Sequence, residues 1–188
     1  MTNARRSART LITGGSRLHK CFHEAGHIEI ALRAGAKVTF AEVPLVGDPH
    51  TSVTHKQDLS TKKPIACGGY SVELILFEEG KLVDVNGIAL SEIAFQQQAM
   101  GHARLDKFPF YLTKNRGADG IWPDATFQPN PDDTWPSESD GSFIEYARQH
   151  VVPLLLPRML IIGALASRLM LGPLDESEID DVRKDFPS

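Results

Sequence analysis

Hydrophobic positions in the first part of the chain follow a helical and then an extended pattern. Residues 16–34 read as one helix, with a serine at its start as a cap and a glycine just past its end. Residues 37–45 favour a strand, and Pro44 marks it as short or at an edge because proline donates no ladder hydrogen bond. After a Gly-Asp-Pro turn, residues 51–54 can return as a second strand. The pattern therefore predicts a helix followed by a hairpin.

The rest of the chain is predicted to be helical around one irregular segment. Four segments predict helices, the last of them with a capping-box pair: residues 64–80, 90–106, 157–171 and the stretch that begins at Asp175. Between Gly117 and Gly141 there are six acidic residues, four prolines and no lysine or arginine, which predicts a long loop. We expect a single domain over residues 1–188, with an acidic, proline-rich loop inserted at about 117–141.

Composition and charge exclude several classes of protein. The 188 residues are 41% hydrophobic, and 20 Lys+Arg against 24 Asp+Glu give a formal charge of −4, which argues against coating nucleic acid or an anionic membrane. Two cysteines cannot form a disulfide framework, so we expect a reducing compartment, the cytoplasm. The amino terminus lacks the apolar segment of a signal peptide, and prolines and arginines interrupt the apolar stretch 151–171. We therefore expect no membrane span.

The strongest candidate chemistry is the sequence His23-Glu24-Ala25-Gly26-His27, which lies inside the first predicted helix. The two histidines are four residues apart, so their side chains lie on one face of the helix and can bind one ion. Neutral imidazoles suit zinc, which lowers the pKa of bound water and polarises a carbonyl. Glu24 borders the same face and can take a proton from that water as a general base. The motif predicts a zinc-dependent hydrolase.

Two histidines leave such a site incomplete, because a catalytic zinc ion usually has three protein ligands and one open position. His19 lies on the same face, but from residue 19 to residue 27 the helix rises about 12 Å, too far for one ion to reach all three histidines. We interpret His19 as a histidine of the surface or the first helical turn. The sequence leaves four candidates open for the third ligand: Asp84, Glu92, His102 and Asp106.

Further segments follow the motif in a characteristic order. They are the extended AKVTFAEVPL, the return TSVTH, the glycine-containing ACGGYSVELILFEEG, and IALSEIAFQQQA. With HEAGH in front of them, their order and approximate spacing over about residues 16–105 resemble the peptidase domain of FtsH-type ATP-dependent zinc metalloproteases. The carboxy-terminal LPRMLIIGALASRLMLGPLDESEIDDV is a weaker match, and residues 107–142 have no counterpart. The chain also lacks the ATPase and the membrane part of that family.

The resemblance assigns roles to individual residues. It implies that His23 and His27 are zinc ligands, that Glu24 is the catalytic base, and that Glu73 either supports a ligand or is structural. The family's third ligand is an aspartate on a later helix, and the corresponding position is Glu92, in Leu90-Ser91-Glu92-Ile93. Glutamate is a competent zinc ligand, although its extra methylene must be absorbed by a shift of the helix or the rotamer. Glu92 is therefore the predicted third ligand.

The expected fold is α+β and mainly α-helical, a zincin-like peptidase domain with a small β-sheet or hairpin beside the active-site helix. The expected activity is zinc-dependent hydrolysis of peptide bonds in flexible or unfolded polypeptides. The expected partners are a polypeptide substrate and either further copies of the chain or a separate delivery partner. His50 and His55 flank the second strand as candidates for stabilising an oxyanion. The alternatives are a non-catalytic zinc-binding or scaffold protein that retains the fold, and a helix whose histidines bind nothing.

Overall fold

The computed structural model describes residues 10–54, 59–111 and 138–186, which form a mainly helical α+β fold, as the sequence predicts. The strands are β1 (Ile12–Thr13), β2 (Lys37–Glu42), β3 (His50–Thr54), β4 (Leu82–Val83) and β5 (Leu174–Asp175). The helices are α1 (Arg17–Arg33), α2 (Leu59–Ala66), α3 (Gly68–Glu78), α4 (Glu92–His102), α5 (Lys107–Phe110), α6 (Glu138–Tyr146), α7 (Val152–Leu155), α8 (Met159–Leu169) and α9 (Glu176–Lys184). A π-helical segment (Ala147–Val151) joins α6 to α7, and a 3-10 segment (Leu156–Arg158) joins α7 to α8.

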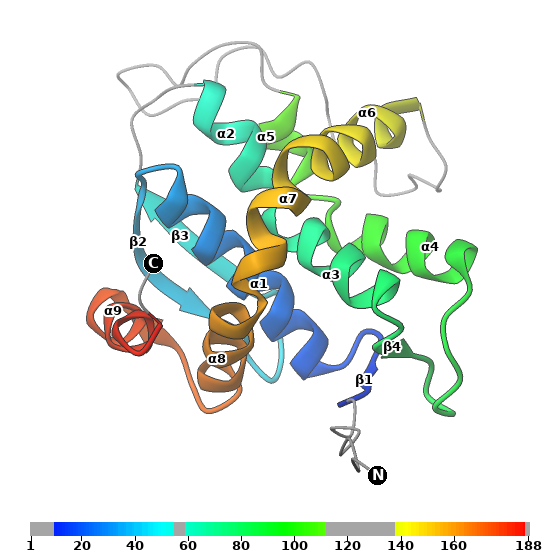
Figure 1. Ribbon diagram of the computed structural model, residues 1–188, viewed down its shortest axis with the longest axis horizontal. Coiled ribbons are helices and arrows are strands. Elements are labelled where there is room, and N and C mark those ends of the chain that lie inside the picture. The colour runs from blue at the N-terminus through cyan, green and yellow to red at the C-terminus, as the bar shows by residue number, and fades with distance from the viewer. Residues whose placement is uncertain (1–9, 55–58, 112–137, 187–188) are drawn as a thin grey trace, which may run out of the picture.

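Helix α1 is the element around which the others pack. It contacts α3, α8 and the strands β2 and β3 (Figure 1). The predicted capping is confirmed: the Ser16 hydroxyl accepts a hydrogen bond from the backbone N–H of His19 at 3.2 Å, and Gly35 follows the helix with a φ of 75°. Apolar side chains of α1 such as Ile28 and Ala31 are fully buried in the core. The helix that carries the histidine pair is thus held on several sides.

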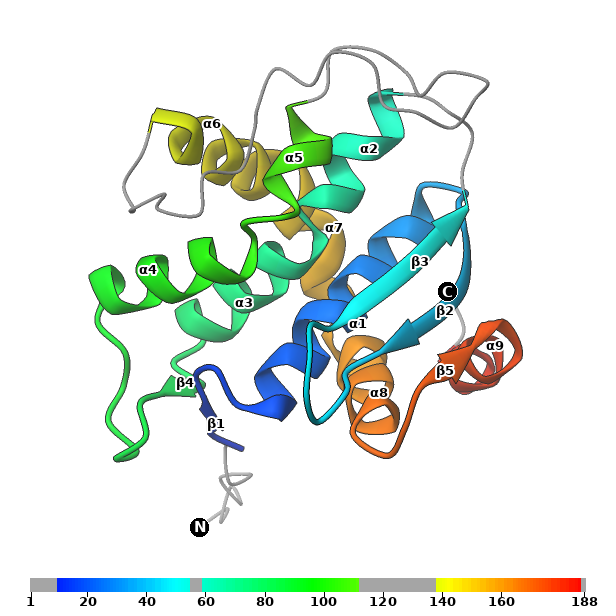
Figure 2. The ribbon, with the colours of Figure 1, turned by 180° about the vertical axis from the view of Figure 1, so that it is seen from behind.

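The three-stranded sheet is antiparallel, with the order β3-β2-β5. The predicted hairpin of β2 and β3 is confirmed, with Val38 opposite Val53. Of the two alternatives for residues 37–45, the structure shows a short strand rather than an edge strand, because β2 ends at Glu42 and β5 from the far end of the chain pairs with its other side. The edge strands of this sheet are β3 and β5, and β3 lies along α1 (Figure 2).

The helix predicted over residues 64–80 is in fact two helices. Helix α2 ends at Ala66, and α3 begins at Gly68. Between them Cys67 has a φ of −83° and a ψ of −3°, and its N–H is shared between the carbonyls of Lys63 and Pro64. Proline lacks the N–H that would continue the ladder, and the glycines that follow favour a change of direction. The break therefore lies at a place where the sequence supports helix least.

The carboxy-terminal helices form one almost continuous helical run. Pro153 and Pro157, which predict a break, lie in the first turns of α7 and of the 3-10 segment that follows it, where a missing N–H is tolerated. By length and composition the run Asp140–Leu169 could cross a membrane, and 33% of its apolar window is buried inside the protein. The absence of a membrane span therefore stays a prediction. Of the predicted loop at 117–141, residues 117–137 lie outside the described ranges, and residues 138–141 begin α6.

Candidate metal centre

Glycine contacts between α1 and α3 set the distance at which the motif helix meets its neighbour. A Cβ atom on Gly26 would lie 2.7 Å from Cγ2 of Val72, and one on Gly68 would lie 2.8 Å from the carbonyl oxygen of Gly26. A Cβ atom on Gly69 would collide with the imidazole ring of His23. The helices therefore approach so closely that only glycine fits, and the His23 ring occupies the space that Gly69 leaves.

The structure brings the two motif histidines together with an aspartate that is distant in sequence. Nε2 of His23 and Nε2 of His27 lie 3.1 Å apart, and Oδ2 of Asp106 lies 3.1 Å from the first and 3.3 Å from the second. Tetrahedral zinc with bonds of 2.0–2.1 Å separates neighbouring donor atoms by about 3.3 Å. The three atoms therefore have the spacing of one face of such a site, and His23, His27 and Asp106 could hold a metal ion.

Glu92, the predicted third ligand, lies elsewhere. It is the first residue of α4 and is exposed, whereas His102 at the other end of that helix contacts Glu73 beside the histidines. The ten residues between the two ends correspond to about 15 Å of helix axis, which no rotamer of Glu92 can span. Asp106, which follows α4 and was one of the four candidates, takes the position assigned to Glu92.

Hydrogen bonds on the far side of each ring fix which nitrogen of the two histidines faces the centre. Nδ1 of His27 lies 2.7 Å from the carbonyl oxygen of Ile65, and since a carbonyl can only accept, Nδ1 carries the proton. Nδ1 of His23 lies 2.8 Å from Oε1 of Glu73, which also accepts. Both Nε2 atoms of the neutral rings therefore direct lone pairs at each other and at the carboxylate of Asp106. Three acceptors converge, and a cation between them would satisfy all three.

The electrostatics of the centre also favour positive charge. Burial lowers the pKa of His23, but its hydrogen bonds to Asp106 and Glu73 outweigh burial and hold that pKa well above its usual value, so that a proton on Nε2 supplies the positive charge when no metal ion is bound. The pKa of His27 is raised as well, because the nearby charge of Asp106 outweighs burial. The two histidines hold the pKa of Asp106 well below its usual range against the opposing effect of burial. Asp106 is thus a carboxylate at neutral pH, as a metal ligand must be.

Glu73 is the buried residue that orients His23 from behind. Its Oε1 accepts hydrogen bonds from Nδ1 of His23 and Nδ1 of His102, each at 2.8 Å. These bonds outweigh burial and lower the pKa of Glu73 to about 2. A carboxylate that holds a ligating histidine in one tautomer is a common feature of metal sites. Of the two roles that the resemblance left open for Glu73, the geometry favours support of a ligand.

His19, Glu73 and His102 form a second group with metal-ligand spacing, but its hydrogen bonds favour a different use. The backbone N–H of Gly15 donates to Nδ1 of His19 at 3.0 Å, so the proton of the neutral ring lies on Nε2 and faces Oε2 of Glu73 at 3.7 Å. A metal ion would need the lone pair of that Nε2. Burial lowers the pKa of His19, which favours the neutral ring. His19 and His102 therefore surround the carboxylate of Glu73 rather than bind a metal ion. His19 is fully buried and does not lie on the surface.

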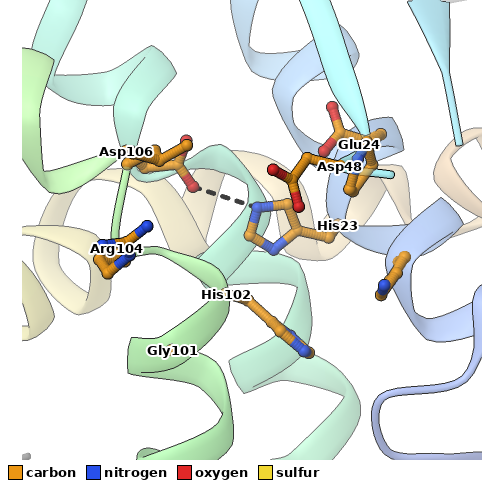
Figure 3. Close-up of a pocket in the computed structure, with 10 residues that line it drawn as sticks. His23, Glu24, Asp48, Gly101, His102, Arg104 and Asp106 are labelled. Carbon is orange, nitrogen blue, oxygen red and sulfur yellow. Dashed lines mark hydrogen bonds and ion pairs between the residues drawn. The ribbon is translucent and has the colours of Figure 1, made fainter. Parts of the chain in front are cut away.

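Glu24 lies where two hollows meet beside the metal centre. It is 4% exposed, and its Oε2 accepts a hydrogen bond from the Thr51 hydroxyl of strand β3 at 2.7 Å. A hollow of about 200 Å³ opens on the side of α4, and another of about 380 Å³ opens on the side of α2 and β3. Glu24 and Asp106 line both (Figure 3 shows the first). Sequence reasoning missed Thr51, because a strand threonine carries no sign of its partner.

The remaining candidates do not join the centre. The side chain of Asp84 forms hydrogen bonds within its own turn, where its Oδ1 accepts from the backbone N–H groups of Asn86 and Ile88 at 2.8 Å each. His50 lines the larger hollow, but its side chain is 52% exposed and lies 3.4 Å from Glu42. His55 lies outside the described residues. Asp84 is therefore a turn residue, and an oxyanion role for His50 stays a prediction.

Comparison with known proteins adds no family to this picture. No protein-family model matches the chain, and a search of curated proteins finds no significant match.

Proposed function

We propose that this chain is a zinc-dependent metallopeptidase with a zincin-like centre, formed by His23, His27 and Asp106. One observation carries the proposal: three potential ligand atoms lie within 3.3 Å of one another, while Nδ1 of each histidine is bound to another group. Imidazole and carboxylate donors suit zinc, and three of them leave one position open. When bound, zinc supplies a Lewis acid that polarises a carbonyl and activates water for attack.

Residues of the chain account for the rest of the reaction. Glu24 lies next to the centre, and the Thr51 hydroxyl holds its Oε2, so that Oε1 can accept a proton from the attacking water. The protonated Glu24 can then pass this proton to the leaving amine. Glu73 and the carbonyl of Ile65 keep the ligating nitrogens in the correct tautomer throughout.

The edge strand β3 supports a polypeptide substrate. It lies beside the centre, contributes Thr51 and Val53 to the larger hollow, and pairs with β2 on one side. An extended chain can pair with the free side of such a strand, which aligns a scissile bond with the catalytic groups. Peptides as the substrate class also follow from the resemblance to FtsH-type peptidases. Cytoplasmic location and a homo-oligomer or a delivery partner accompany this proposal as predictions.

Metal content tests the ligand set. In natively purified protein we expect about one zinc ion per chain, as a three-ligand site holds. The variant Asp106→Asn should lose it, while Glu92→Gln, a matched change at the exposed end of α4, should keep it. Zinc loss in Glu92→Gln with retention in Asp106→Asn would reverse the assignment. A wild-type chain without zinc, even after zinc is supplied, would sink the proposal and leave histidines that bind nothing.

Cleavage of unfolded casein tests the activity separately. We expect Glu24→Gln to keep its zinc and to lose about 10²- to 10⁴-fold in rate, the usual contribution of a general base. Thr51→Val should weaken cleavage less, because it removes only the group that holds Glu24. If the zinc-loaded wild type cleaves no peptide, the peptidase proposal fails and a non-catalytic zinc-binding scaffold takes its place.

A further inference from the structure

The smaller hollow beside the metal centre is polar and contains two cations. It is lined by residues of α1, of the β2–β3 loop and of the end of α4, among them Lys20, His23, Glu24, Asp48, His102 and Arg104. Figure 3 shows Arg104 on the side of Asp106, with Glu24 and Asp48 on the other side of His23. The volume of this smaller hollow, about 200 Å³, is below the range of pockets for drug-sized ligands, so the hollow suits a single side chain or a chain end.

Lys20 and Arg104 are half-buried, and neither forms an ion pair with any residue in the described parts of the chain. Other arginines of the fold are paired, as Arg158 is with Glu29 at 3.0 Å and Arg148 with Glu78 at 2.7 Å. Holding charged side chains partly out of water without a partner is unfavourable. The hollow is thus lined by two cations that pair with no carboxylate of the described residues.

Three carboxylates also line the hollow, and they have other contacts or are exposed. Glu24 accepts from Thr51, and Asp106 lies against the two ligating histidines. Asp48 is exposed on the β2–β3 loop. An incoming carboxylate could therefore meet the fork of the Arg104 guanidinium and the Lys20 ammonium without displacing an internal ion pair.

The two hollows differ in the side chains they would accept. The larger one is lined by more apolar groups, including Val53, Ile65 and Ala66, and also by His50. Both hollows meet at Glu24 and Asp106, so a chain that crosses the centre places one flanking residue in each. Charge recognition is expected on the α4 side of the scissile bond, and apolar contact on the side of α2 and β3.

We propose that Lys20 and Arg104 form a carboxylate-binding subsite, so that the enzyme prefers substrates with a carboxylate next to the scissile bond. The inference rests on the proposed peptidase function. The carboxylate could belong to an acidic side chain or to the carboxyl terminus of the substrate. Lys20 lies one helical turn before Glu24 on α1, and Arg104 lies two residues before Asp106. The subsite is thus built on the same two segments as the catalytic residues.

Binding tests the subsite without requiring turnover. The zinc-loaded full-length Glu24→Gln protein would be titrated by fluorescence anisotropy with matched peptides that carry Glu or Gln beside the cleavage position. We expect the Glu peptide to bind about 10-fold more tightly, as loss of a charged hydrogen-bond partner implies. The preference should disappear in Arg104→Gln and in Lys20→Gln, and persist in Arg33→Gln at the exposed end of α1. Equal affinity for Glu and Gln peptides, together with no loss of affinity when the chain end is amidated, would overturn the subsite.

Capping the peptides distinguishes the two sources of the carboxylate. A C-terminal amide should weaken the binding of both peptides if the subsite binds chain ends, and should leave the preference for the Glu peptide intact if it binds acidic side chains. Either pattern supports the subsite, provided that Arg104→Gln removes it. A Glu preference without casein cleavage in the wild type would retain the subsite and refute the peptidase. Casein cleavage with no carboxylate preference would retain the peptidase and refute the subsite.

Discussion

Replacing Glu73 by glutamine tests whether the buried carboxylate behind His23 tunes the metal centre. The change keeps the size of the side chain and one acceptor oxygen, but it removes the charge. Glu73 is fully buried, and its Oε1 receives Nδ1–H of His23 and of His102 at 2.8 Å each. The new amide N–H₂ would also face the Nε2–H of His19, which lies 3.7 Å from Oε2 in the wild type. Glutamine thus weakens the hydrogen bonds to His23 and His102, and it places its amide N–H₂ opposite the N–H donor of His19.

The magnitude follows from what such partners contribute in metal sites. Loss of a group that orients a ligating histidine typically lowers metal affinity 10- to 100-fold, and we expect the zinc Kd of Glu73→Gln to rise by that factor, about 1.4–2.8 kcal/mol. Competition with a chromophoric chelator at neutral pH measures this Kd. Glu78→Gln is the matched control, because it lies on the same helix but is exposed and pairs with Arg148.

Two measurements separate the metal effect from a folding effect. Circular dichroism of the zinc-free variant shows whether the helices remain, and thermal unfolding without zinc gives the stability change on its own. A folded Glu73→Gln protein with the wild-type zinc Kd would refute the argument that this carboxylate fixes the tautomer of His23. A rise in Kd in Glu78→Gln as well would show that the charge of α3, rather than contact with His23, matters.

Three further predictions concern the packing and the core. Gly26→Ala should lower the free energy of unfolding by about 1–3 kcal/mol, because its Cβ would lie 2.7 Å from Cγ2 of Val72; an unchanged urea midpoint would contradict the close contact. Ser16→Ala should cost about 1 kcal/mol in the same assay by removing the cap on the N–H of His19. Burial raises the pKa of Cys21 to about 11, so iodoacetamide at mildly alkaline pH should label it, by mass spectrometry, only after denaturation.

Local signals in the sequence account for much of the fold. The serine cap, the glycine that ends α1 and the capping box at Asp175 are short patterns with a direct physical cause, and each is found in the structure. The spacing of His23 and His27 likewise places both on one helix face without reference to the rest of the chain. Helix caps and the spacing of residues on one helix face depend only on residues that are near in sequence, so they could be predicted.

Contacts between distant segments could not be predicted in the same way. The choice between Glu92 and Asp106 depends on which end of α4 reaches α1, and the pattern of α4 itself contains no such information. The central position of β2 depends on β5, which pairs with it from the far end of the chain. The carbonyl of Ile65 that orients His27 carries no residue-specific signal, because every residue has a carbonyl.

The wide separation along the chain of the residues that we propose as ligands has a consequence for folding. His27 and Asp106 are 79 residues apart, and β2, β3, α2, α3 and α4 all lie between them. An ion that joins the two acts as a cross-link, which closes this loop and reduces the freedom of the unfolded chain. For a covalent link around a loop of this size, the chain-entropy treatment gives about 4 kcal/mol of stabilisation. A zinc ion bound in this centre would therefore stabilise the native topology as well as supply the proposed chemistry, and a chelator would lower the free energy of unfolding.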